Sequence, residues 1–141
     1  MKDKIKILDE KLHSAKSVAI MAHKNPDGDA LCSVLALGRL IEENYGIKCV
    51  CIYDGNAPDY LDGIPLRNLA HCWGRVSFNK PFDVAILVDY GAEHQIGGPL
   101  DIVKDAKYVI EIDHHINDKP IADLCIDDEK IIYDLKSATK R

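Results

Sequence analysis

The chain has 141 residues and a mass of 15.7 kDa, a size that suits one domain. Hydrophobic residues make up 47% and charged residues 29% of the sequence, which excludes a disordered or collagen-like protein. The formal net charge of -5 argues against binding long nucleic acid through a broad basic face, but leaves a short oligonucleotide or nucleotide open. We expect no membrane contact, because no apolar run approaches the roughly 20 residues of a membrane span and residues 1–10 lack the apolar core of a signal peptide.

The cysteines of the chain indicate a reducing compartment. Their number, five, is odd, and they are spread through apolar segments without an export signal, so we expect free thiols and a cytoplasmic location. Cys49 and Cys51 are two residues apart in a predicted strand and would share one of its faces. A zinc site would need a second matching pair, so packed thiols are the favoured interpretation.

Segments with helical and strand-like hydrophobic patterns alternate along the chain. Apolar residues at helical spacing predict an amphipathic helix over 5–15. A buried strand is predicted at 17–22, followed by a polar turn and a helix at 29–45 that Gly46 would cap. The further predicted elements are strands at 47–53, 82–88 and 108–112, less distinct strands at 69–76 and 121–126, a loop with one helical turn at 54–65, and helices at 99–106 and 127–139.

Strands that alternate with helices predict an α/β fold. This pattern produces βαβ units, which build a Rossmann-like, mainly parallel sheet with helices on both faces. Ligands of such sheets bind beyond the carboxyl ends of the strands. Polar clusters directly follow three of the predicted strands, namely His23 to Asp29, Asp89, and Asp113 to His115.

These three clusters would meet at one edge of a parallel sheet. Carboxylates packed together repel one another unless a cation compensates their charge, and a divalent metal ion is the simplest compensation. Imidazole nitrogen combined with carboxylate oxygen suits manganese, iron or zinc, and the number of donors allows two bridged ions. Each cluster alone is also typical of a turn, since Pro26-Asp27-Gly28 is a turn sequence. Three clusters at three strand ends favour a shared metal site.

Three segments resemble the motifs of the DHH phosphoesterase superfamily. They are VAIMAHKNPDGDALCSVLALGRLI for the first motif, VAILVDYG for the second and IEIDHHIND for the third. The resemblance extends from about Ser17 to Asp127. This superfamily includes RecJ-like exonucleases, nano-RNases that also hydrolyse phosphoadenosine phosphate, and family II inorganic pyrophosphatases.

The resemblance implies a metal ligand set. His23 and Asp27 would hold one metal ion. Asp29 and His114 would hold a second ion, and Asp89 would bridge the two. The implied ion is Mn²⁺.

The resemblance also implies two catalytic residues, His115 and Asp113. His115 would face the substrate phosphate, and Asp113 would orient the histidines of the site. The residues themselves add a further expectation. Gly28 would let the backbone bend so that the carboxylates of Asp27 and Asp29 both turn inward. The N-terminal end of the helix that follows would favour an anion.

The function that the resemblance implies is hydrolysis of a phosphate ester by a metal-activated water. Short oligonucleotides or phosphorylated nucleotides are the expected substrates, which makes the chain a hydrolase with nuclease or phosphatase activity. Two alternatives stay open: a family II-type inorganic pyrophosphatase, and a truncated, non-catalytic DHH domain that binds metal or nucleotide.

The sequence departs from the family at its C-terminal side. The family's fourth motif and its C-terminal substrate-binding domain are absent after residue 127. We therefore expect residues 1–141 to form a single, truncated DHH-type catalytic domain with a weak second metal site and impaired turnover. A homodimer is compatible with the sequence.

Overall fold

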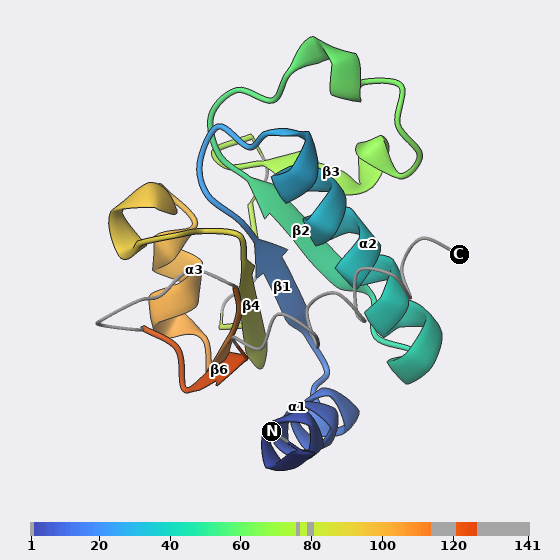
Figure 1. Ribbon diagram of the computed structural model, residues 1–141, viewed down its shortest axis with the longest axis vertical. Helices are drawn as coiled ribbons and strands as arrows, with labels where there is room; N and C mark the ends of the chain where they lie inside the picture. The colour runs from blue at the N-terminus through green and yellow to red at the C-terminus, as the bar shows by residue number, and fades with distance from the viewer. Residues whose placement is uncertain (1, 76, 79–80, 114–120, 127–141) are drawn as a thin grey trace.

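The computed structural model describes residues 2–75, 77–78, 81–113 and 121–126. Within these ranges six strands form one sheet in the order β3-β2-β1-β4-β5-β6, and all neighbouring strands are parallel (Figure 1). The predicted parallel α/β sheet is therefore confirmed. The strands are β1 (Val18–Met21), β2 (Cys49–Tyr53), β3 (Ala70–Cys72), β4 (Val84–Val88), β5 (Tyr108–Ile112) and β6 (Leu124–Ile126).

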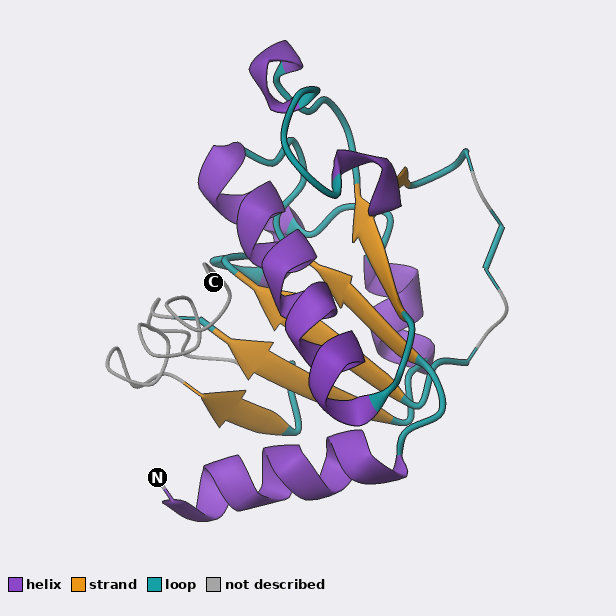
Figure 2. Ribbon diagram, turned by 90° about the vertical axis from the view of Figure 1, so that its right-hand side faces the viewer, coloured by secondary structure: helices purple, strands orange, loops and turns teal. Residues whose placement is uncertain are grey.

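Helices cover both faces of this sheet, as predicted. The long helix α2 (Gly28–Tyr45) lies across one face and α3 (Leu100–Asp105) lies on the other (Figures 1 and 2). Helix α1 (Lys2–Ser14) lies beside β6, where Lys4 Nζ donates a hydrogen bond to the carbonyl oxygen of Cys125 at 2.8 Å. Three short 3-10 turns complete the described elements: η1 (Asp59–Leu61), η2 (Arg67–Leu69) and η3 (Glu93–Gln95). The helix predicted at 127–139 lies outside the described residues.

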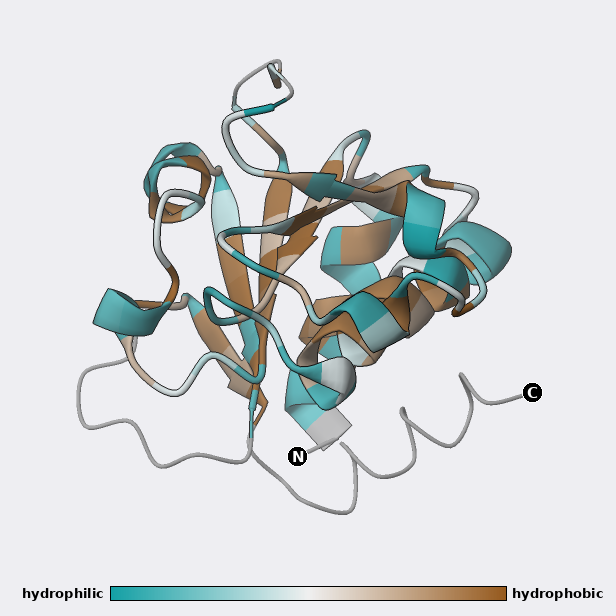
Figure 3. Ribbon diagram, turned by 90° about the horizontal axis from the view of Figure 1, so that it is seen from above, coloured by the Kyte–Doolittle hydropathy of each residue, from teal (hydrophilic) through white to brown (hydrophobic). Residues whose placement is uncertain are grey.

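Alternation along the central strands produces two apolar layers. Successive strand residues point to opposite faces, so Ile20 and Ile86 pack on the α2 side while Met21 and Leu87 pack on the α3 side. All residues of β1 and β4 are buried, which explains why both strands read as continuous apolar runs rather than alternating ones. Figure 3 shows this hydrophobic centre between more polar outer segments.

The boundaries of α2 follow from its capping residues. The carboxylate oxygen Oδ1 of Asp27 accepts a hydrogen bond from the backbone N–H of Ala30 at 2.8 Å, which makes Asp27 the N-cap. At the other end Gly46 adopts a left-handed conformation with φ 70° and donates its N–H to the carbonyl of Glu42. The predicted glycine cap is confirmed, and the helix begins at Gly28, one residue earlier than expected.

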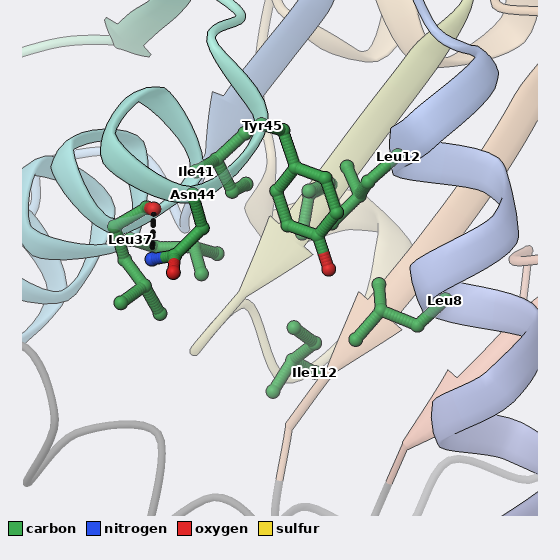
Figure 4. Close-up of a pocket in the computed structure, with 9 residues that line it drawn as sticks. Leu8, Leu12, Leu37, Ile41, Asn44, Tyr45 and Ile112 are labelled. Atoms are coloured by element: carbon green, nitrogen blue, oxygen red, sulfur yellow. Dashed lines mark hydrogen bonds between the residues drawn. The ribbon is translucent and has the colours of Figure 1, made fainter.

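A groove between α1 and α2 is apolar in character (Figure 4). It has a volume of about 260 Å³, and Leu8, Leu12, Leu37 and Ile41 contribute to its walls. Asn44 at its edge donates a hydrogen bond to the carbonyl of Leu40 at 2.8 Å. The other lining residues are aliphatic apart from Tyr45, so the groove offers few polar groups among the described residues.

The cysteine thiols are free, as expected from the sequence. Cys49 and Cys51 share the α2-facing side of β2, and burial raises the pKa of each thiol to about 12. Among the described residues no cysteine belongs to a group of potential metal ligands. Both thiols pack against the α2-facing core, Cys51 as a buried member and Cys49 at its edge. No helix in the described part of the chain is long and apolar enough to span a membrane.

Candidate metal centre

Three potential metal ligands converge where β1 and β4 lie side by side. The chain leaves β1 toward β2 on one side and β4 toward β5 on the other, so a crevice is expected between these two strand ends. His23 and Asp27 follow β1, and Asp89 follows β4. One donor atom from each residue lies within 4.8 Å of the other two, and this is the one such group in the described ranges. We refer to His23, Asp27 and Asp89 as the ligand group.

The hydrogen bond of His23 leaves one ring nitrogen available to a metal ion. Its Nδ1 lies 2.8 Å from the carbonyl oxygen of Lys24. A carbonyl oxygen only accepts hydrogen bonds, so Nδ1 must carry the proton in this contact. The neutral imidazole then has its lone pair on Nε2, which is the usual arrangement of a histidine ligand whose other nitrogen is held by the protein.

Asp27 combines a structural role with a free carboxylate oxygen. Oδ1 caps α2 through Ala30, as described above. The side chain is exposed, and a carboxylate has two oxygens, so Oδ2 keeps its lone pairs for a ligand on the open side. The capping hydrogen bond therefore fixes the orientation of the carboxylate and leaves Oδ2 able to bind a metal ion.

A sharp turn after β4 presents Asp89. Asp89 has a left-handed backbone with φ 47°, and Gly91 follows with φ 75°. Between them the side chain of Tyr90 is 1% exposed and packs into the α3-facing core. Aspartate adopts the left-handed conformation more readily than most residues, so this turn suits the sequence.

Asp113 holds this turn from the end of β5. Its carboxylate oxygen Oδ2 accepts hydrogen bonds from the backbone N–H groups of Tyr90 and Gly91, both at 3.1 Å. Asp113 is 2% exposed. It therefore supports the segment that carries Asp89. Its predicted role toward His114 and His115 stays a prediction, because both histidines lie outside the described residues.

Asp29 does not join the ligand group. It lies in the exposed first turn of α2, two residues after the cap. Residues two apart on a helix point in different directions. Gly28 is already the first helical residue, and the predicted role of Asp29 at a second ion stays a prediction. His94, on η3, is exposed and also lies outside the group.

The donor set of the ligand group fits a divalent cation. One neutral imidazole and two carboxylates supply three donors and a formal charge of -2, which a divalent ion would balance. Mixed nitrogen and oxygen donors suit manganese, iron or zinc better than magnesium. The same three residues come from two loops that only the folded sheet brings together.

The turn after β2 contacts both of these loops, which sequence reasoning missed. The segment Tyr53 to Asn56 had the pattern of an ordinary turn. In the structure the backbone carbonyl of Asp54 accepts the N–H of Asn25 at 2.7 Å, and its Oδ2 accepts the N–H of Gly98 at 2.8 Å. Its position in the sequence could have indicated this role, because Asp54 directly follows a strand, as do the three polar clusters that predicted the metal site.

Comparisons with known proteins agree with this architecture. The model of the DHH family, N-terminal domain, matches residues 17–137. A crystal structure of an exopolyphosphatase-related protein from Bacteroides fragilis superposes with a TM-score of 0.84 at 20% sequence identity. The match covers 99% of this chain and 44% of that protein, so the chain spans less than half of its length. This likeness concerns the fold. A search of curated proteins found no match.

Proposed function

Because the chain belongs to the DHH family, we propose that it is a metal-dependent phosphoesterase acting on short oligonucleotides or phosphorylated nucleotides. The observation that carries this proposal is the ligand group at the end of β1 and β4. The six strands form one sheet with a core layer on each face, which supports a single catalytic domain. The free thiols support a cytoplasmic location.

In this proposal each residue of the site has a separate task. His23 and Asp27 would hold one ion, and Asp89 would serve both that ion and a second one. Asp29 and His114 would complete the second position. We propose Mn²⁺ because the donors combine nitrogen and oxygen. Such an ion supplies charge neutralisation and activates water for attack on phosphorus.

The remaining parts of the site act on the phosphate and on the loops. We propose that His115 contacts the substrate phosphate. The N-terminal end of α2 lies at the ligand group and favours a bound anion through its dipole. Asp113 keeps the Asp89 turn in place through two backbone hydrogen bonds. Fixed geometry of this kind contributes to catalysis by reducing the reorganisation that the reaction requires.

The net charge of -5 supports a small substrate rather than a long nucleic acid. A second candidate is hydrolysis of a phosphoanhydride, as in an inorganic pyrophosphatase, because the structural neighbour is described as exopolyphosphatase-related. A substrate panel separates the two. Faster turnover of a dinucleotide or a nucleotide monoester than of pyrophosphate would support the first proposal, and the reverse order would support the second.

Metal binding is the direct test of the proposal. Mn²⁺ binding to the folded state alone stabilises it by about 2.7 kcal/mol when the free ion is at 100 times its Kd. For a chain of this size that gain corresponds to a rise in Tm of roughly 5–10 °C. We expect this rise for the parent chain and none for Asp89→Ala.

The control is Asp101→Ala, which removes an exposed carboxylate on α3 that is not a member of the ligand group. Its Tm should rise with Mn²⁺ as in the parent chain. A parent chain whose melting curve does not change in excess Mn²⁺ would refute the metal centre.

A further inference from the structure

The loops that carry the ligand group are joined by the turn after β2. Asp54 accepts one backbone N–H from each side: Asn25 donates to its carbonyl oxygen at 2.7 Å, and Gly98 donates to its Oδ2 at 2.8 Å. Asn25 lies between His23 and Asp27, and Gly98 belongs to the segment that continues from Asp89. A single residue therefore bridges the two loops whose relative position defines the ligand group.

Further hydrogen bonds and close contacts join the turn after β2 to the loops after β1 and β4. Asn25 has a left-handed backbone with φ 51°, and its side-chain Oδ1 accepts the backbone N–H of Asn56 at 2.9 Å. The N–H of Lys24 donates to the carbonyl of Gln95 at 2.6 Å, so the two ligand loops also touch directly. At Gly97, where φ is 83°, a Cβ atom would collide with Oδ2 of Asp54.

We propose that Asp54 is a positioning residue of the metal centre: its carboxylate fixes the loop after β4 against the loop after β1. The inference rests on the proposed function, because it concerns the affinity of the ligand group for a divalent ion. Asp54 is not itself a member of that group. A hydrogen bond from a backbone N–H to a charged carboxylate is stronger than a neutral one, which suits a carboxylate to this task.

The effect should be on metal affinity more than on stability. Asp54→Ala removes the acceptor for Gly98 but leaves the backbone contact with Asn25 intact. Residues that orient metal ligands from outside the coordination sphere typically change affinity by about 10–100-fold. We expect the Kd for Mn²⁺ to rise at least about tenfold in Asp54→Ala. Asp54→Asn keeps an oxygen that can accept the same hydrogen bond, so it should recover most of the affinity.

The experiment is a titration of each purified chain with Mn²⁺, with free Mn²⁺ measured by its EPR signal. The parent chain, Asp54→Ala and Asp54→Asn are compared with Asp59→Ala, which removes an exposed carboxylate from η1 in the same loop. Urea unfolding without metal shows whether each variant is folded. The expected result is weakened binding in Asp54→Ala alone, with Asp54→Asn and Asp59→Ala close to the parent.

The possible outcomes separate the two proposals. If the parent chain does not bind Mn²⁺, the metal centre itself is wrong. If the parent binds and Asp54→Ala binds equally well, Asp54 has no positioning role. If Asp54→Asn binds Mn²⁺ as weakly as Asp54→Ala although both are folded, the oxygen that accepts the Gly98 N–H does not explain the affinity. Should Asp54→Ala fail to fold, the comparison of Asp54→Asn with the parent still decides, because loss of affinity there would overturn the inference.

Discussion

Replacing Asp113 by alanine should destabilise the protein through two backbone groups at once. Oδ2 of Asp113 accepts the N–H groups of Tyr90 and Gly91, both at 3.1 Å, and Asp113 is 2% exposed. Alanine offers no acceptor, and the N–H of Tyr90 lies in a buried residue. A buried donor that loses its partner carries the full penalty of its lost hydration.

The expected magnitude follows from these contacts. A hydrogen bond to a charged group contributes about 1.5–3 kcal/mol, so two of them amount to roughly 3–6 kcal/mol. Gly91 is half-buried, and water reaching its N–H would reduce the loss, which places the expected value for Asp113→Ala near 3 kcal/mol. Asp113→Asn keeps a neutral acceptor oxygen of nearly the same shape. Its loss should be about half as large.

Urea unfolding followed by circular dichroism measures these differences. The unfolding midpoint should fall in the order parent, Asp113→Asn, Asp113→Ala, with little change in the slope of the free energy against urea concentration. The control is Asp105→Ala at the exposed end of α3, which should stay within about 0.5 kcal/mol of the parent. An Asp113→Ala variant as stable as this control would refute the reasoning.

Two further predictions concern groups away from the metal centre. Exposed Cys32 should react with a thiol reagent within minutes, while Cys51 should react only on unfolding, because it is buried and its pKa is raised to about 12; equal rates in the native protein would contradict this. The hydrogen bond from the backbone N–H of Lys16, and to a lesser degree the charge of Lys107, hold the pKa of Asp83 below its usual value of 3.8. The charged Asp83 therefore contributes to stability above pH 3.8, and this contribution is lost as the pH falls through the lower pKa of the folded state. Asp83→Asn should therefore reduce stability at neutral pH and narrow its difference from the parent at low pH, as measured by urea unfolding across pH; a difference that stays constant would show that Asp83 makes no charge-dependent contribution.

The sequence predicted the elements better than it predicted the contacts between loops. The apolar run at 108–112 predicted the bounds of β5 correctly, and the helical spacing of apolar residues predicted those of α2 to within one residue. Burial on one or both faces of an element leaves such a pattern in the sequence. A turn residue leaves no such signal. The role of Asp54 depends on which loops become neighbours when β2 lies next to β1 in the sheet, and that order is a property of the whole fold.

The same distinction applies within the ligand group. His23, Asp27 and Asp89 were expected together because each follows a strand, and a parallel sheet brings such residues to one edge. The position of Asp29 was harder to infer, since it depends on where α2 begins. With Asp27 as the cap, Gly28 is helical and Asp29 lies in the exposed first turn of α2, outside the ligand group. Its place at a second ion stays a prediction.

The adjacency of β1 and β4 also has a consequence for how the site arises during folding. These strands pair directly in the sheet, yet β2 and β3 lie between them in the sequence. Closing so long a loop costs chain entropy before the contact is made, which makes such parallel pairings slow compared with local structure. A nascent chain that has made only β1, α2 and β2 has two members of the ligand group but not Asp89. The ligand group is thus complete only after β4 has paired with β1, so metal binding during refolding would show that this long-range pairing has formed.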